Sequence, residues 1–174
     1  MTIRKILTEP DLFLRQKSIK VDNVDDEIRS LMIDMLETMY EAPGIGLAAI
    51  QIGVPKRVIV IDLSRDDEKK NPLYFVNPEI ITNSDNEATY EEGCLSVPGQ
   101  FAEVDRPNKC HVSYLDYNGQ KKELKAEGLL ATCIQHEMDH LEGILFIDYL
   151  SKLKKNYIVK KLSKQKKVLE RIVV

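Results

Sequence analysis

Residues 128–143 read GLLATCIQHEMDHLEG, a stretch with two histidines four positions apart, His136 and His140. Positions four apart lie on one face of an α-helix. The stretch therefore predicts a helix over 128–141 that ends at Gly143, because glycine is the residue that most often follows the end of a helix.

Two neighbouring stripes of this predicted helix differ in character. The face that carries the histidines continues backwards into sulfur and apolar side chains, in the order His140, His136, Cys133, Leu129. The stripe beside it is apolar and contains Leu130, Ile134 and Leu141. The histidines are therefore expected to belong to a partly buried wall, and the apolar stripe to pack against the rest of the protein.

Hydrophobic periodicity predicts two more helices outside this stretch. Residues 25–40 carry apolar side chains at helical spacing, and Pro43-Gly44 stops the pattern. Residues 150–172 form the second, with an expected apolar side made of Leu150, Leu153, Tyr157, Leu162 and Leu169.

Runs of β-branched or alternating residues between the helices predict strands. Residues 57–63 are expected to form a buried strand, and the polar residues 64–72 a loop. Further strands are predicted in two adjacent pairs, 74–77 with 79–82, and 110–115 with 121–124 around a turn at Asn118-Gly119. Helices and strands are segregated along the chain, so the expected class is α+β, with residues 1–174 forming one domain.

The composition of the chain argues against nucleic-acid-binding, membrane and disulfide-rich proteins. The chain has 174 residues, 43% hydrophobic composition and a net charge of −3, which implies no global attraction to nucleic acid or to an anionic membrane. It contains no run of about eighteen apolar residues and no export signal at its start, so no membrane association is expected. Three cysteines are too few for a disulfide framework, and a cytoplasmic location is expected.

Residues 136–140, HEMDH, form an HExxH motif. The two histidines can bind one metal ion together, and Glu137 between them is placed to move protons. A solvated histidine pair on a surface helix is the alternative interpretation of so short a pattern.

A catalytic metal site usually needs a third protein ligand and one open position. Cys133 lies on the correct helical face, but it is more simply interpreted as a small core residue that lines a pocket. Cys94, in a glycine-containing segment far away in the sequence, would tie a loop or a strand end to the helix. Cys110 and His111 are adjacent in a predicted strand and point to opposite faces, so they are not expected to bind one metal together.

Three segments resemble the peptide deformylase family. They are 44–51 (GIGLAAIQ), 92–96 (EGCLS) and 135–141 (QHEMDHL). The three motifs in this order and at these separations are highly specific. The resemblance implies antiparallel β-sheets around the metal-binding helix, with helices towards both ends of the chain. It also implies hydrolytic removal of the formyl group from the formylmethionine at the N-terminus of new proteins.

The resemblance implies a role for each matching side chain. The implied metal ligands are Cys94, His136 and His140. They would hold one divalent ion per chain, Fe(II) in the first place, with Zn(II) or Ni(II) as alternatives. Glu137 would act as general base and acid, while Gln51 and the backbone N–H of Leu95 would face the developing oxyanion.

Substrate binding is expected to combine a side-chain pocket with main-chain pairing. Ile45, Leu129 and Cys133 are candidates to surround the methionine side chain, with ordinary core packing as the alternative for each. The peptide is expected to add as a strand along Gly44, Ile45 and Gly46. Main-chain hydrogen bonds ignore side chains, which suits substrates as varied as all N-formylmethionyl nascent polypeptides.

Two further positions concern the family pattern. Many relatives carry a basic residue near the position of Phe101, so contacts with later residues of the substrate are expected to differ. The family also suggests a pairing of Glu92 with Arg106.

The C-terminal segment is strongly basic. Residues 152–171 contain nine Lys or Arg and one Glu, so this segment carries +8 and the remainder of the chain −11. Docking on ribosomal RNA, which some relatives achieve with this helix, and a simple solvated helix face are the two interpretations. The protein is expected to be a monomer.

Two rival functions remain open at this stage. An HExxH metallopeptidase or another amidase would share the helix, but it would not explain the segments around Gln51 and Cys94. A protein with a structural metal would need four ligands, with Cys133 as the fourth.

Overall fold

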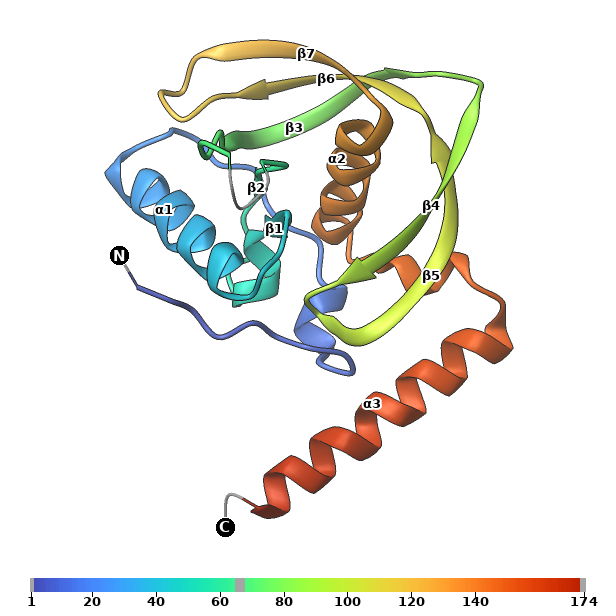
Figure 1. Cartoon of the computed structure of the whole chain (residues 1–174). Helices are drawn as coiled ribbons and strands as arrows, with labels where there is room; N and C mark the ends of the chain where they lie inside the picture. The colour runs from blue at the N-terminus through green and yellow to red at the C-terminus, as the bar shows by residue number, and fades with distance from the viewer. Residues whose placement is uncertain (1, 65–67, 173–174) are drawn as a thin grey trace.

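Within residues 2–64 and 68–172, which a computed structural model describes, the chain forms two β-sheets, three α-helices and three short 3₁₀-helices (Figure 1). The α-helices are α1 (Asp26–Glu41), α2 (Gly128–Leu141) and α3 (Lys152–Ile172). The strands are β1 (Gly46–Ala48), β2 (Val58–Ile61), β3 (Leu73–Asn83), β4 (Glu87–Cys94), β5 (Val97–Pro107), β6 (Lys109–Leu115) and β7 (Lys121–Glu127). The 3₁₀-helices are η1 (Leu12–Arg15), η2 (Ala49–Ile52) and η3 (Phe146–Tyr149).

Both sheets are antiparallel. The larger sheet has the strand order β1-β2-β3-β6-β7, and β4 pairs with β5 as a separate two-stranded ribbon. In Figure 1, α2 lies between the larger sheet and this ribbon, with α1 and α3 towards the two ends of the chain. The expected α+β class and the arrangement of antiparallel sheets around a central helix are therefore confirmed. None of the helices in the described part of the chain has the length and apolar character that a membrane crossing requires.

Strand β2 packs against α1 on one face of the larger sheet and against α2 on the other. Val58 and Val60 pack in one hydrophobic cluster with α1, whereas Ile59 and Ile61 pack in a second cluster with α2. Successive side chains of a strand point to opposite faces, so a strand covered on both sides is apolar at every position. All four side chains are fully buried, which confirms the predicted buried strand.

Several predicted elements have the predicted bounds or nearly so. Helix α2 covers 128–141, and Gly143, two residues after its last residue, adopts a positive φ of 75°. Helix α1 begins after Asp25, whose carboxylate accepts a hydrogen bond from the backbone N–H of Ile28 at 3.0 Å. The hairpin of β6 and β7 turns through Asn118-Gly119 as expected.

The prediction that 74–77 pairs with 79–82 is wrong, because both belong to the single strand β3. The interruption that suggested two strands is a bulge. Asn77 has a φ of 50°, and the register with β6 shifts between Val76 and Glu79. The side chain of Asn77 bonds both the backbone N–H and the carbonyl oxygen of Val21, each at 2.8 Å, and this fixes the bulge.

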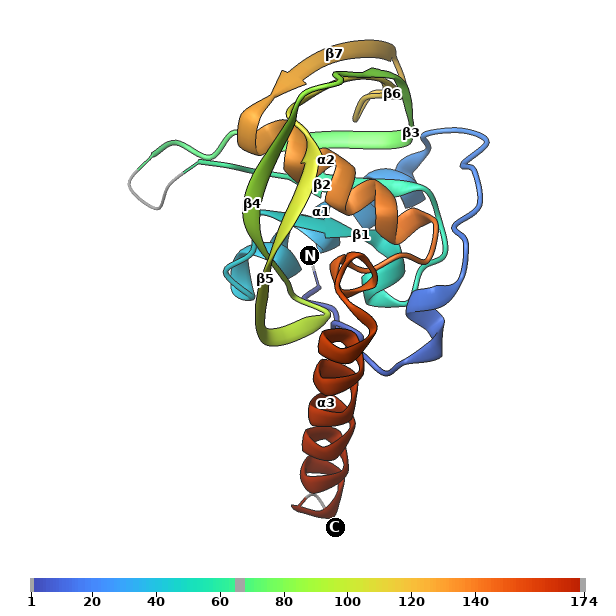
Figure 2. The ribbon, with the colours of Figure 1, turned by 90° about the vertical axis from the view of Figure 1, so that its right-hand side faces the viewer.

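The predicted apolar side of α3 is only partly correct. Leu162 is buried as expected, together with Ile158, against the ribbon and η3. Leu153 and Tyr157 are instead 82% and 66% exposed. The side chain of Leu169 lies outside the described residues. Figure 2 shows the C-terminal half of α3 extending away from the rest of the molecule, and the buried side chains among the described residues of the helix lie before this half or at its start, at Ile158 and Leu162.

Candidate active site

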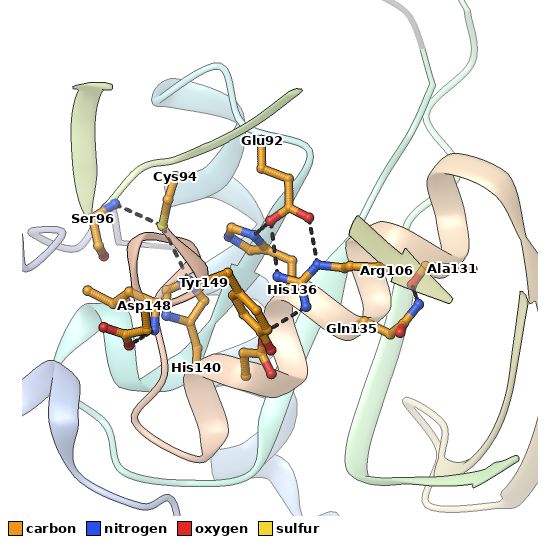
Figure 3. A network of polar contacts seen from close by, with 12 residues as sticks. Glu92, Cys94, Ser96, Arg106, Ala131, Gln135, His136, His140, Asp148 and Tyr149 are labelled. Atoms are coloured by element: carbon orange, nitrogen blue, oxygen red, sulfur yellow. Dashed lines mark hydrogen bonds and ion pairs between the residues drawn. The ribbon is translucent and has the colours of Figure 1, made fainter. Parts of the chain in front are cut away.

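Three side chains with sulfur or nitrogen donors meet where the ribbon touches α2. His136 and His140 come from one face of α2, and Cys94 is the last residue of β4. One donor atom from each of the three lies within 4.8 Å of the others. The sulfur of Cys94 is 3.3 Å from Nε2 of His140 (Figure 3). The fold thus brings together residues that are 46 positions apart in the sequence.

The ring of His136 is held in one orientation by a carboxylate. Nδ1 of His136 lies 2.8 Å from Glu92 Oε2, so its Nε2 is left to face the cluster. Burial by itself lowers the pKa of His136, but hydrogen bonding with Cys94 and Glu92 outweighs it and the pKa rises well above its usual value. For His140 burial and the neighbouring His136 act together, and its pKa falls well below the usual value.

Glu92 is in turn paired with Arg106, as the family pattern suggested. Nε and Nη2 of Arg106 donate to the two carboxylate oxygens of Glu92 at 2.6 and 3.0 Å. Both side chains are almost completely buried, with 4% and 5% of their surface exposed. The expected pairing of Glu92 with Arg106 is confirmed.

The donor set fits a divalent metal ion. A thiolate and two imidazoles are ligands suited to Fe(II), Zn(II) or Ni(II), and three protein donors leave a position for water or substrate. Within the described part of the chain, Oε2 of Glu137 beside the cluster is buried without a hydrogen-bond partner, as is Nδ1 of His140, the ring nitrogen that does not approach Cys94. Cys133 lies outside this donor cluster, with its sulfur 3.9 Å from the carbonyl oxygen of Ile45.

Glu137 is buried beside the cluster and packs tightly against Gly46. A Cβ built on Gly46 would overlap Oε1 of Glu137 and would lie 3.0 Å from the sulfur of Cys133. Burial raises the pKa of Glu137 to about 7, while the charge of His136 acts in the opposite direction. A carboxyl group with such a pKa can take up and release a proton near neutral pH.

Gln51 is held by both ends of its amide group. Its Oε1 accepts a hydrogen bond from the backbone N–H of Ala48 at 2.8 Å. Its Nε2 lies 3.0 Å from Ser96 Oγ and 3.6 Å from the sulfur of Cys94. The donor end of the amide therefore faces the segment that carries Cys94 and Leu95.

A cavity of about 490 Å³ opens beside these groups. All five residues predicted to bind substrate line it, namely Gly44, Ile45, Gly46, Leu129 and Cys133. Gln51, Cys94, Leu95, His136 and Glu137 also line it, whereas His140 does not. Ile45 and Leu129 are each 46% exposed, so they form its rim.

One wall of the cavity was indicated by the sequence only at Phe101. Tyr90, Gly93 and Phe101, from β4 and β5, line it. A Cβ on Gly93 would lie 2.5 Å from the ring of Phe101, so the ring covers this glycine closely. The available signal was the pair of Gly93 and an exposed aromatic residue, but without a predicted ribbon nothing placed them opposite each other.

Comparisons with known proteins agree with this geometry. Residues 3–156 match the family model described as polypeptide deformylase. The chain is 70% identical to the peptide deformylase of Pelagibacter ubique over 174 residues, with all of both chains covered. It is 63% identical to the peptide deformylase of Phenylobacterium zucineum over 167 residues, which covers 96% of this chain and 99% of the relative.

Solved structures give the same result. The peptide deformylase of Ehrlichia chaffeensis in complex with actinonin superposes with a TM-score of 0.91 at 44% identity, over 95% of this chain and 98% of that one. The peptide deformylase of Legionella pneumophila superposes with a TM-score of 0.89 at 46% identity, over 98% and 99% of the two chains.

Proposed function

Because this chain belongs to the polypeptide deformylase family, we propose that it removes the formyl group from N-terminal formylmethionine of newly synthesised proteins and releases formate. The family is metal-dependent, and the chain carries a donor cluster of the matching kind. The observation that supports the proposal most directly is the convergence of Cys94, His136 and His140 beside buried Glu137.

Cys94, His136 and His140 would hold one divalent ion. A bound ion of this kind lowers the pKa of a coordinated water from 15.7 to about 7, which provides hydroxide at neutral pH. We propose Fe(II) as the ion. Zn(II) and Ni(II) are alternatives, because a thiolate and two imidazoles bind all three ions. Glu92 and Arg106 keep His136 in the orientation that this role requires.

Glu137 is the proposed general base and acid. Its carboxyl group takes a proton from the attacking water and later gives it to the departing methionine nitrogen. With a pKa raised to about 7 by burial, the group is suited to both transfers. Close packing against Gly46 leaves it little freedom to turn away from the cavity.

Gln51 and Leu95 are the proposed donors to the formyl oxygen. Negative charge develops on this oxygen as the carbonyl becomes tetrahedral, and donors that are already oriented stabilise it. The Nε2 group of Gln51 is fixed near Cys94 by its bonds with Ala48 and Ser96. The backbone N–H of Leu95 follows Cys94 directly in the chain.

The methionine side chain would enter the cavity between Ile45, Leu129 and Cys133, and the peptide would pair along Gly44 to Gly46. Beyond the site, we propose that residues 1–174 act as one catalytic domain, as a monomer in the cytoplasm. We further propose that the basic helix α3 docks on ribosomal RNA near emerging chains.

The test is formate release from N-formyl-Met-Ala-Ser by protein loaded without oxygen with Fe(II) and separately with Zn(II). Glu137→Ala is the control, with bound metal quantified in every sample. Formate release from the native protein that falls about 10²–10⁴-fold in the control would support the proposal. A native protein that binds metal stoichiometrically and releases no formate would reject it.

A further inference from the structure

A continuous series of polar contacts runs from His136 to the surface behind α2. Glu92 accepts from His136 and is bound by two nitrogens of Arg106, as described above. The remaining terminal nitrogen of Arg106, Nη1, donates to Asp139 Oδ2 at 2.8 Å. The hydroxyl of Tyr149 donates to the same Asp139 oxygen, also at 2.8 Å. Figure 3 shows this network, with Glu92 facing both His136 and Arg106.

The series becomes more exposed from one end to the other. The Arg106 and Asp139 side chains expose 4% and 18% of their surface, whereas Tyr149 is 51% exposed. One guanidinium is shared between two carboxylates, Glu92 inside and Asp139 outside. In a poorly solvated environment, the strength of the hydrogen bond between Arg106 and Asp139 affects how strongly the guanidinium attracts the carboxylate of Glu92. Asp139 therefore influences how strongly Glu92 polarises His136.

Tyr149 touches two members of the series in different ways. Its hydroxyl bonds Asp139, and its ring lies 4.9 Å from the guanidinium carbon of Arg106. A ring at this distance attracts the cation and covers it from water. The hydroxyl holds Asp139 in place, and the ring shields the ion pair behind it.

The same short helix also touches His136 directly. Phe146, at the start of η3, stacks on the His136 ring with the ring centres 6.3 Å apart. Tyr149 is at the end of η3, and Asp148 before it is bonded to Arg15 and to the backbone N–H of Leu145. Helix η3 is thus a fixed support that reaches the ligand by ring stacking at one end and by the polar series at the other.

We propose that Tyr149 is a positioning residue for His136, and that it sets metal affinity and coordination geometry through Asp139, Arg106 and Glu92. Partners of metal ligands outside the coordination sphere commonly change affinity about 10–100-fold when removed. Tyr149 is several contacts further out, so the lower end of this range applies. The inference rests on the proposed metal site.

Three variants separate the contributions of the ring and the hydroxyl. Tyr149→Ala removes both, Tyr149→Phe removes only the hydroxyl, and Tyr157→Ala removes an exposed tyrosine of α3 as the matched control. Zn(II) affinity is measured by competition with a chromophoric chelator on protein whose folding is checked by circular dichroism. The visible absorption spectrum of the Co(II) form reports coordination geometry, which a purely structural role of Tyr149 would not alter.

We expect Tyr149→Ala to weaken Zn(II) binding about tenfold and to shift the Co(II) bands. Tyr149→Phe should give a smaller change in the same direction, and Tyr157→Ala should match the native protein. Native affinity and native spectra in both Tyr149 variants would overturn the inference, as would equal weakening by Tyr157→Ala. If Tyr149→Ala does not fold, Tyr149→Phe decides by the same two measurements. A native protein that binds no metal would reject the proposed site itself, whereas unchanged variants of a metal-binding protein reject only the role of Tyr149.

Discussion

Gly46 places the backbone of β1 in direct contact with the proposed general base. A methyl group at this position would overlap Glu137 Oε1 and press on the sulfur of Cys133. Residue 46 therefore has to lack a side chain. Its absence leaves room for Glu137 and for a peptide that would pair along 44–46.

Gly46→Ala should lower kcat for formate release about 10²-fold, because a displacement of about 1 Å at a catalytic group can cost that much. Metal content should stay near that of the native protein, since residue 46 is not one of the three residues of the donor cluster. Gly44→Ala is the comparison, because its methyl group would meet the flexible end of Leu95. Equal kcat values for Gly46→Ala and the native protein would contradict the tight packing of Glu137.

Gln51→Ala should reduce kcat/KM about 10²–10³-fold through loss of one oxyanion donor. Ser96→Ala removes the hydroxyl next to Gln51 Nε2 without removing a proposed donor, so its loss of kcat/KM should be much smaller. Comparable losses in the two variants would indicate that Gln51 acts by supporting the loop and not by contacting the substrate.

Much of the candidate site could be predicted from the sequence. Helical spacing joined the two histidines, and the family motifs supplied Cys94, Gln51 and Leu95. It could not supply the contact of Tyr149 with Asp139, because this depends on how η3 folds back after α2. Nor could it place Phe101 over Gly93, because that requires the register of β4 with β5.

Among the elements, η3 depends on the charge of Asp148. Its carboxylate meets Arg15 at 2.5 Å and Lys155 at 2.5 Å, and accepts from Leu145 N–H at 2.9 Å. Burial alone would raise the pKa of Asp148, but these partners outweigh it and the pKa lies below its ordinary value of 3.8. A carboxyl group with a depressed pKa stabilises the fold above its ordinary pKa, and the contribution is lost as pH falls through the lower folded value.

Asp148→Asn should therefore lower the free energy of unfolding by about 1.5–3 kcal/mol at pH 7, the range for lost hydrogen bonds to charged groups. The difference from the native protein should shrink below about pH 4, where Asp148 of the unfolded chain takes up a proton, and should vanish once the pH falls below the depressed pKa of the folded protein. Urea unfolding at several pH values measures this. Asp26→Asn is the control, since Asp26 is fully exposed and pairs only within the first turn of α1. If the loss of unfolding free energy in Asp148→Asn does not vary with pH, the charge of Asp148 does not stabilise the fold in this way.

Elements with one clear periodicity were predictable, and those shaped by tertiary contacts were not. Helix α2 and the β6–β7 hairpin follow local rules of capping and turn formation. Strand β3 passes through a bulge that is fixed by Val21, which lies far away in the sequence. The β4–β5 ribbon alternates exposed and covered positions, but polar residues such as Glu92, Gln100 and Arg106 occupy several of the covered ones, so its sequence lacks a regular apolar alternation.

In the molecule as a whole, α3 has two halves with different partners. Ile158 and Leu162 pack with β5 and η3, whereas residues 164–168 are exposed. Figures 1 and 2 both show the second half projecting beyond the body of the protein. The first half contributes to the fold, and the second half is free to meet a large anionic partner.

Truncation after Ser163 should leave the unfolding midpoint and formate release unchanged but weaken co-sedimentation with ribosomes at low salt. Truncation after Asn156 is the comparison. It also removes Ile158 and Leu162, each worth about 1.5–3 kcal/mol when buried, and should be clearly less stable. Unchanged co-sedimentation after truncation at Ser163 would exclude docking through the projecting half of α3.

The position of Cys94 at the end of the ribbon has one more consequence. An ion held by Cys94 and His140 would cross-link points 46 residues apart, much as a disulfide does. Because it would bind the native arrangement of these residues and not the unfolded chain, it would favour the native state by mass action. Chelation should then act as a mild denaturant that first loosens β4 and β5, and amide hydrogen exchange in these strands should quicken before exchange in β2, which lies between two helices.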